Sequence, residues 1–321
     1  QQLLHAPNAQ KEGPQLLKYL AELGKIHQSI RPVLRAESPA ADIKALAKSI
    51  VAGEPNDLLQ AVKNTDVLLQ KLDSESTDGM TALLIEPLMM SMRGIVERAK
   101  IEAAKRWEVE TYPMCSRNVE GHFPFRLVGG DAPMADFAEV FHPENGALWK
   151  FYQTELKPFV TEGAERWEVK QWASIHMELS KEFLGLLSHA RLISDSLFPK
   201  GSGDAAVGFE VYPYPPAGGV KSVTEIRLEI GGQQLRYRME PQEWHDMKWP
   251  GQTPLLGALL QVQVGGTWVG KEYKDWWGLF RLIQAGRLTP TVGETQYRIQ
   301  WDLPTADGQA IKVQYDLRAP T

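Results

Sequence analysis

The chain has 321 residues, of which 43% are hydrophobic and 23% are charged, and its formal net charge is −5. This composition is typical of a globular protein, and the length predicts about two domains. Lys and Arg do not outnumber Asp and Glu in the part of the chain before Gly201 or in the part after it. The chain therefore lacks the basic surface that a nucleic-acid partner would need. A single cysteine, Cys115, excludes an internal disulfide and a cysteine-rich zinc site.

The part of the chain up to residue 200 predicts helices. Its apolar residues recur at intervals of three and four, the period of an amphipathic helix, and strand patterns are few. Pro87 lies inside the longest pattern, where it predicts either a kink or the true start of that helix. The expected helices cover residues 14–30, 38–53, 56–72, 80–108, 147–160 and 175–197.

The character of the sequence changes after the turn-forming residues 198–203. Apolar and polar residues then alternate, as they do in half-buried strands. Residues 275–286 interrupt this pattern and predict one short helix, capped by Asp275 and closed by Gly286. The expected strands form a hairpin of 223–230 and 233–239 around Gly231–Gly232, a further strand at 259–264, and a second hairpin of 296–301 and 311–317.

These patterns predict an α+β fold. An N-terminal all-helical domain over residues 1–200 is followed by an antiparallel β-sandwich-like domain with one short helix over residues 201–321. The alternative is a helical domain subdivided near residues 111–130. Six of the ten tryptophans lie between Trp244 and Trp301, which suits the core of two packed sheets. No run of about 18 apolar residues predicts a membrane span, and residues 1–5 read as the cut end of a longer protein.

The segment His122–Gly146 and the nearby Cys115 raise the question of a catalytic site. Cysteine, histidine and aspartate are the residue types of nucleophilic and metal sites, but the sequence around a catalytic cysteine is specific to its family. The neighbourhood Tyr112–Ser116 matches no such pattern, so we interpret Cys115 as a small apolar residue. The phenylalanines and prolines of the segment instead favour a packed structural corner.

Other chemical motifs are incomplete. His176-Met-Glu178 resembles half of a zinc deaminase pattern, but the later cysteine pair is absent. The glycine-rich stretch at 201–208 lacks the lysine of a P-loop and precedes a strand. We therefore predict no catalytic residue, no cofactor and no metal ligand. A remote pair of carboxylates leaves no sequence pattern, so that possibility stays open.

Aromatic residues beside prolines and turns suggest a docking surface for a partner. Such side chains combine a rigid position with partial exposure, which is what interface anchors need. The alternative is that they belong to the core. The candidate partner-binding residues are Tyr212, Tyr214, Trp244 and Trp249.

Two motifs resemble the C-terminal periplasmic region of the TssM (IcmF) family of the type VI secretion system. The first comprises Phe123-Pro124-Phe125, Asp131, Asp136-Phe137, Phe141-x-Pro143-x-x-Gly146, Phe151, Leu156, Phe159-Val160 and Trp167. The second comprises Trp249-Pro250-Gly251 and then Trp277-Gly-Leu-Phe280-Arg-Leu-Ile283. One departure is Asp275-Trp276, where the family has Gly-Pro. The residues before about position 100 carry no matching motif.

The resemblance implies a fragment of an inner-membrane protein whose membrane-spanning segments lie outside this chain. It implies a location in the periplasm and binding of the outer-membrane lipoprotein TssJ through the β-rich domain. Other copies of TssM in the assembled complex are further implied partners, and the implied role is structural, without catalysis. The alternative is a periplasmic carbohydrate- or peptidoglycan-binding module or a cell-wall enzyme.

The corner segment, Phe123 to Gly146, then has an expected structural role. Phe123 and Phe125 insert into the helical core and Pro124 fixes the turn between them, while Phe137 and Phe141 face the same side of a helix. Asp131 and Pro133 are expected to open that helix.

Overall fold

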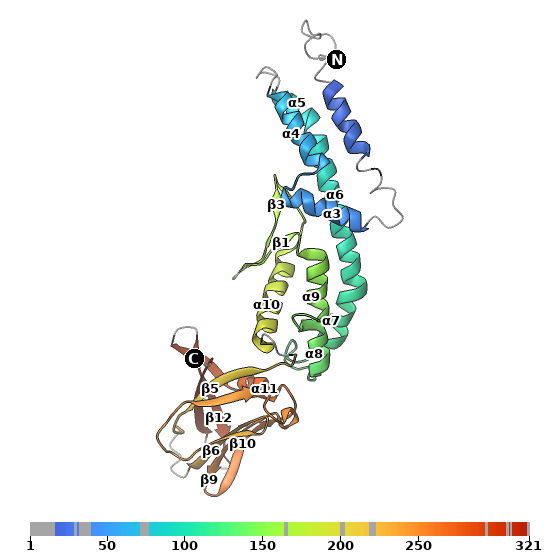
Figure 1. Ribbon diagram of the computed structural model, residues 1–321. Helices are drawn as coiled ribbons and strands as arrows, with labels where there is room; N and C mark the ends of the chain where they lie inside the picture. Colours follow the sequence, from blue (N-terminus) through green and yellow to red (C-terminus); the bar gives the residue numbers. More distant parts are fainter. Residues whose placement is uncertain are drawn as a thin grey trace. The chain divides into compact units, whose positions relative to one another are not determined.

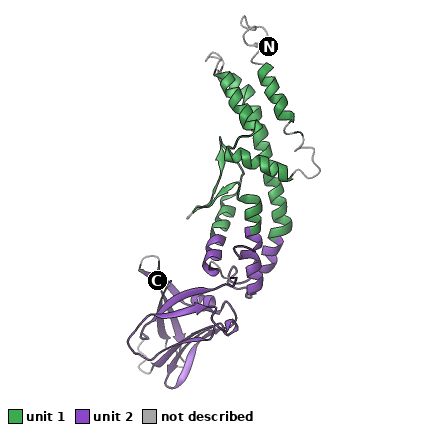
Figure 2. Ribbon diagram, viewed as in Figure 1, with its two compact units in different colours: residues 1–112, 150–189 green, residues 113–149, 190–321 purple. Residues whose placement is uncertain are grey.

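The computed structural model describes residues 17–28, 31, 40–70, 77–163, 166–199, 203–217, 223–292, 295–305, 308 and 310–319. The chain divides into two compact units, unit 1 with residues 1–112 and 150–189 and unit 2 with residues 113–149 and 190–321 (Figure 2). Helices predominate in unit 1 and antiparallel strands in unit 2 (Figure 1). The predicted α+β class is confirmed.

The helices form where the sequence has its amphipathic patterns. In α3 the buried side chains include Ile43, Ala47 and Ile50, spaced three and four apart. Pro87 lies in the first turn of α6, so it marks the start of a new helix and produces no kink. Residues 17–28 are helical, followed by α3 (Ala40–Ala52), α4 (Asp57–Leu69), α5 (Thr77–Leu84), α6 (Glu86–Arg106), α7 (Tyr112–Asn118), α8 (Met134–Phe141), α9 (Ala147–Phe151) and α10 (Lys181–Leu197), with π-helical turns η2 (Trp107–Thr111) and η3 (Tyr152–Leu156).

A buried carboxylate ties three elements of unit 1 together. Glu155 of η3 is 4% exposed and receives hydrogen bonds from Lys44 of α3 and Arg106 at the end of α6, at 3.1 and 2.8 Å. Beside it, the ring of Trp107 packs against Phe151 and Phe183. Sequence reasoning predicts neither of the two π-helical turns, η2 and η3.

Unit 1 also contains two small sheets that the sequence pattern did not predict. They are β1 (Val160–Thr161) with β2 (Glu168–Val169), and β3 (Gln171–Trp172) with β4 (Ile175–His176). The helix expected from residue 175 begins only at Lys181, where the hydroxyl of Ser180 accepts a hydrogen bond from the Phe183 N–H. Strands of two residues are too short to show any period, which explains the error.

Unit 2 contains two antiparallel sheets. The four-stranded sheet has the order β10-β9-β6-β7 and the five-stranded sheet the order β11-β12-β13-β5-β8. The strands are β5 (Val207–Pro213), β6 (Val223–Ile230), β7 (Gln233–Tyr237), β8 (His245–Trp249), β9 (Ala258–Val264), β10 (Thr267–Tyr273), β11 (Arg287–Val292), β12 (Gln296–Pro304) and β13 (Ala310–Arg318), with a 3-10 turn η4 (Pro254–Leu256) and helix α11 (Gly278–Gln284).

Both predicted hairpins are present. β6 pairs with β7 and β12 with β13, and Gly231 and Gly232 both have positive φ angles, as the tight turn between β6 and β7 requires. Alternate residues fill the core. They include Ile226, Leu228 and Ile230 on one sheet and Ile299, Trp301, Leu303, Ile311, Val313 and Tyr315 on the other, all at most 3% exposed.

The short helix begins later than predicted, whereas Gly286 directly follows its C-cap residue Ala285, where the sequence placed the closing glycine. Asp275 does not cap it, because this residue adopts a φ of +68° and the helix begins at Gly278. A Cβ on Gly278 would lie 2.2 Å from the carbonyl oxygen of Tyr273, so the helix starts where its backbone presses against the end of β10. At the other end, a Cβ on Gly286 would lie 2.6 Å from Ile299, so this glycine serves close packing after the helix has ended.

Candidate docking surface

The corner segment packs on α11 within unit 2. The indole N–H of Trp277 donates to the carbonyl oxygen of Ala132 at 2.7 Å, and Arg281 donates to the carboxylate of Asp131 and to the carbonyl oxygen of Gly129. The guanidinium of Arg281 also lies 4.2 Å from the ring centre of Phe123. Residues about 150 positions apart in the sequence thus form one cluster.

Aromatic rings form the interior of this cluster. Phe137 is fully buried, and its ring centre lies 4.8 Å from that of Phe141 and 5.1 Å from that of Trp277. Phe280 packs beside Trp277 at 5.5 Å. The structure therefore brings Phe123, Asp131, Phe137 and Phe141 of the first sequence motif together with Trp277 and Phe280 of the second. Phe137 and Phe141 face the same side of α8, as expected.

Two details of the corner segment correct the sequence interpretation. Phe125 does not insert into a core, since it is 43% exposed and stacks over Phe137 and Phe141 from outside. Asp131 does not open α8, which begins at Met134 after Pro133, because its carboxylate is paired with Arg281. Phe123 is buried, and Pro124 follows it in the loop through a cis peptide bond.

The partner-binding candidates Tyr212, Tyr214 and Trp244 lie together on the five-stranded sheet. The ring centre of Tyr212 is 5.3 Å from those of both Tyr214 and Trp244, and all three side chains are half-buried. Arg298 lies 4.4 Å from the ring centre of Tyr214, and Arg318 lies 4.1 Å from that of Trp244. We call these five residues the aromatic–arginine surface.

Two carboxylates hold the arginines of this surface in place. Arg318 donates two hydrogen bonds to Glu210, which lowers the pKa of that carboxyl, and Arg298 donates two to Asp316. Burial acts to raise the pKa of Asp316, but the hydrogen bonds from Arg298 and Tyr214 outweigh it and hold this pKa below its usual value. Both acids are thus charged at neutral pH, and the guanidinium planes are fixed beneath the aromatic rings.

Trp249 does not belong to this surface. It is 1% exposed, its ring packs against Trp277 and Phe280, and its indole N–H donates to the carbonyl oxygen of Trp276. The physical reason is its position in β8, where alternate side chains point toward α11 and the core. Trp249 is therefore not accessible as a surface anchor, whereas Trp244 is half-buried.

Sequence reasoning missed Arg298 and Arg318. Both stand at polar positions of alternating strands, and that pattern indicates only that they face outward. The contacts of Arg298 with Tyr214 and of Arg318 with Trp244 depend on the pairing of β13 with β5, strands separated by about 100 residues, and of β5 with β8. The signal that could have found them is the pairing register, which a single sequence does not contain.

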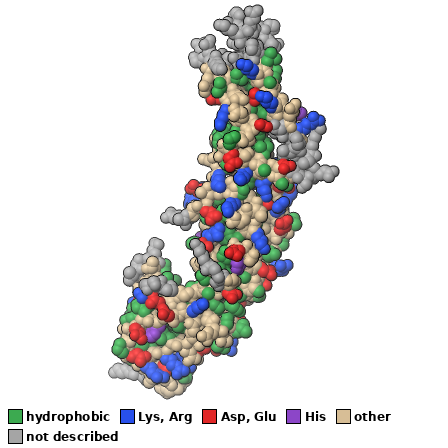
Figure 3. All heavy atoms as spheres, in the orientation of Figure 1, with side chains coloured by type: hydrophobic (Ala, Val, Ile, Leu, Met, Phe, Trp, Pro, Cys, Tyr) green, Lys and Arg blue, Asp and Glu red, His purple; other side chains and the backbone are tan. Residues whose placement is uncertain are grey.

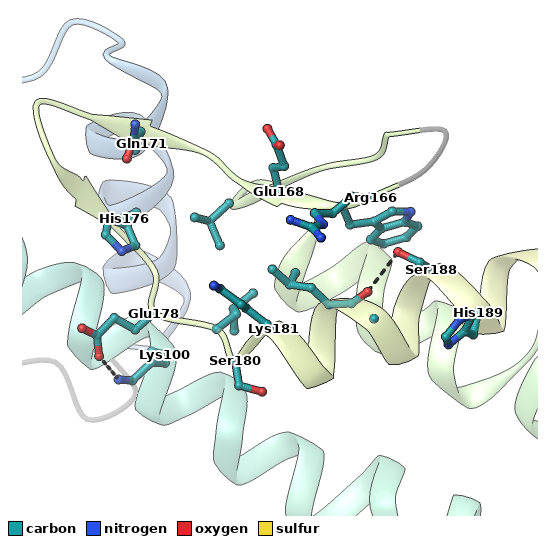
Figure 4. Close-up of a pocket in the computed structure, with 15 residues that line it drawn as sticks. Lys100, Arg166, Glu168, Gln171, His176, Glu178, Ser180, Lys181, Ser188 and His189 are labelled. Atoms are coloured by element: carbon teal, nitrogen blue, oxygen red, sulfur yellow. Dashed lines mark hydrogen bonds and ion pairs between the residues drawn. The ribbon is translucent and has the colours of Figure 1, made fainter.

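The structure also offers a cleft in unit 1, between the β2–β4 segment and α10 (Figure 4). Its volume is about 960 Å³, and its lining includes His176, Glu178 and Ser188. Glu178 lies 3.7 Å from Lys100, and the Ser188 hydroxyl donates to the carbonyl oxygen of Leu184 rather than to an imidazole. Glu178 and Ser188 are thus engaged in local structural contacts.

Among the described residues there is no cluster of three or more His, Cys, Asp or Glu side chains with the geometry of a metal site. Nor does the described part of the chain contain a helix with the length and apolar character needed to cross a bilayer. Acidic and basic side chains are interspersed over the face shown in Figure 3.

Replacing Cys115 by alanine is expected to be nearly silent. Burial raises the pKa of the Cys115 thiol to about 11, so the thiol is protonated at neutral pH and is a poor nucleophile. We expect Tm and partner binding to be unchanged in the variant, and alkylation of the native chain by iodoacetamide at neutral pH to be much slower than that of a free thiol. Rapid alkylation, or loss of function in the variant, would show that the cysteine is active.

Two family models cover most of the chain. Residues 100–205 match the type VI secretion protein IcmF helical domain, and residues 209–321 match the type VI secretion protein IcmF C2-like domain. The second model covers the two sheets and α11, and the first covers the corner segment and α10. These two matches define a protein of the type VI secretion class. The chain belongs to the IcmF (TssM) family.

Individual relatives agree with this assignment. The chain is 23% identical over 239 residues to the type VI secretion system component TssM1 of Pseudomonas aeruginosa PAO1. The aligned residues make up 74% of this chain and 21% of that protein. The chain thus spans about a fifth of the length of this curated relative.

Solved structures share the fold. A chain of a structure described as a type VI secretion system membrane core complex superposes with a TM-score of 0.76 and 21% identity. The match covers 99% of this chain and 64% of that chain. The C-terminal domain of the T6SS protein TssM from EAEC matches 70% of this chain and 91% of its own, with a TM-score of 0.59 and 23% identity.

Proposed function

We propose that this chain is a non-catalytic structural part of the type VI secretion membrane complex. In this proposal it lies in the periplasm and docks the outer-membrane lipoprotein TssJ through residues 201–321. Residues 1–200 act as a periplasmic spacer, segments of a longer protein outside this chain anchor it in the inner membrane, and other copies of TssM are neighbours in the complex. Family membership and the likeness to membrane core complexes support this role.

The aromatic–arginine surface is the observation that carries the docking proposal. Tyr, Trp and Arg are the residue types that most often dominate binding energy in protein interfaces. Here they are half-buried and held in one orientation by ion pairs to Asp316 and Glu210. A surface that is already ordered loses little entropy when a partner binds. We expect an interface of about 1,600 Å² in total.

Point variants test this proposal better than a truncation. Removal of everything after Gly203 should abolish binding, but it would also remove Trp277 and so uncover the ring of Phe137, which packs against it. We therefore expect Trp244→Ala and Arg318→Ala to weaken binding of TssJ from the same organism about tenfold or more each, measured by calorimetry. Arg287→Ala, at an exposed position of β11, is the matched control and should bind normally.

Two outcomes would contradict the proposal. One is full TssJ binding by both variants with their folds intact, and the other is TssJ binding by residues 1–200 alone. A peptidoglycan sedimentation assay and an assay for released muropeptides examine the alternative of a cell-wall-binding module or enzyme. Sedimentation with peptidoglycan, or release of muropeptides, in the absence of TssJ binding would favour that alternative.

A further inference from the structure

Three arginines surround one glutamate on the outer face of the four-stranded sheet. Ile226, Leu228 and Ile230 of β6 point into the core, so Arg227 between them points outward. Glu225 lies beside Arg227 at a register shift in the pairing of β6 with β9 and is 7% exposed. Arg236 in β7 and Arg238 just after it stand beside them. We call Arg227, Arg236 and Arg238 the arginine cluster.

The glutamate organises the cluster without balancing its charge. Arg238 Nε donates to one carboxylate oxygen of Glu225 at 2.8 Å, while Arg227 and Arg236 lie 3.8 and 3.9 Å from the other oxygen. The hydrogen bond from Arg238 holds the pKa of Glu225 below its usual value, so the carboxylate is charged at neutral pH. Three positive charges therefore surround the Glu225 carboxylate, and Glu240 is a second acid near Arg238, so positive charge remains in local excess.

The arrangement is electrostatically costly in the isolated chain. Arg227 and Arg236 are direct partners across β6 and β7, and like charges placed opposite each other destabilise a sheet. In the described part of the chain, Arg227 Nε and Glu225 Oε1 are both buried without a hydrogen-bond partner. Arg227 is held over the ring of Trp268 at 4.4 Å. Local rules that are broken in this way often mark functional sites.

We propose that the arginine cluster binds carboxylate groups of an acidic segment of a partner protein. A guanidinium presents a planar fork of N–H donors that matches a carboxylate, and most donors of this cluster are not used within the described residues. A carboxylate placed between Arg227 and Arg236 would relieve their repulsion. This site lies on the sheet that does not carry the aromatic–arginine surface, so it goes beyond the proposed TssJ docking and stands independently of it.

The neighbouring charges favour a protein segment over an anionic lipid surface. Glu229 of β6 pairs with Leu259 of β9, and Leu259 pairs with Glu272 of β10, which places two acids in one row across the same face. A continuous negative surface would meet these acids and be repelled. An extended segment can direct individual carboxylates toward the arginines and keep them away from Glu229 and Glu272.

The test uses the full chain and a fluorescent oligoglutamate peptide at about 0.15 M salt, where charges more than about 8 Å away are largely screened. Arg227→Gln/Arg236→Gln should weaken binding about tenfold or more, measured by fluorescence anisotropy. The matched control is Lys248→Gln/Arg287→Gln, which removes the same charge from exposed positions of the five-stranded sheet. This control should bind almost normally.

Each remaining outcome decides the question. An equal loss of peptide affinity in both double variants would overturn the proposal in favour of a general charge effect. The absence of peptide binding by the native chain would also overturn it. Tighter binding to phosphatidylglycerol vesicles than to the peptide would overturn it in favour of a lipid surface. The cluster variant should also keep or raise Tm, because it removes a like-charge pair.

If the cluster variant unfolds more easily than the native chain, Arg227→Lys/Arg236→Lys replaces it. This variant keeps both charges and loses the guanidinium forks. It should still bind the peptide several-fold more weakly, and binding equal to that of the native chain would refute the proposal.

Discussion

Replacing Trp249 by alanine is expected to lower the free energy of unfolding of unit 2 by about 3–5 kcal/mol. The indole is 1% exposed, contacts the rings of Trp277 and Phe280, and donates to the carbonyl oxygen of Trp276. Its removal leaves a cavity between β8 and α11 and also an acceptor without its donor. Chemical denaturation followed by tryptophan fluorescence measures the loss.

Trp244 supplies the matched control for this prediction. It is half-buried, and its main contacts are with Arg318 and Tyr212. We expect Trp244→Ala to cost about 1 kcal/mol or less of stability, the size of an exposed cation–π contact, while it weakens TssJ binding. If Trp244→Ala destabilised the protein as much as Trp249→Ala, then Trp244 would be a core residue and the aromatic–arginine surface would lose its anchor.

The contrast between these two tryptophans shows where sequence reasoning ends. Both stand near prolines or turns, and both read as candidate anchors from the sequence. Alternation within a strand says that neighbouring residues face opposite sides, but it does not say which side another element covers. The position of α11, joined to β8 only through long-range packing, decides that Trp249 is buried.

Local patterns gave the β6–β7 and β12–β13 hairpins correctly. Their strands alternate over five or more residues, and Gly231–Gly232 supplies the turn between the first two. β1 to β4 were missed because each has two residues. The start of α11 was also misplaced, since it depends on how closely Gly278 approaches the backbone of Tyr273.

The segment Phe123–Phe141 of the first motif and Trp277–Ile283 of the second identified one cluster of unit 2 but not all of its contacts. Asp131 looked like a helix-opening residue because it precedes Pro133, whereas its partner is Arg281, 150 positions away. The arginine cluster gave no sequence signal at all. Arg227 and Arg236 are unremarkable polar positions until the β6–β7 register places them opposite each other.

Phe137→Ala is expected to destabilise unit 2 by about 3–5 kcal/mol. Phe137 is fully buried, and its ring contacts Phe141, Phe198 and Trp277, which come from three different parts of the chain. Its removal opens a cavity at the point where the corner segment meets α11. We expect amide hydrogens of α8 and α11 to exchange faster together in the variant.

Phe125→Ala is the control for Phe137→Ala, because the same ring type stacks on the same cluster from outside. Phe125 is 43% exposed, so its loss should cost no more than about 1 kcal/mol. A large effect of Phe137→Ala with a small effect of Phe125→Ala would show that the corner segment is held by its buried ring. Equal effects would mean that Phe125 also contributes to the core, as the sequence interpretation had it. A small effect of both would leave the hydrogen bonds of Trp277 and Arg281 as the contacts that join this segment to α11.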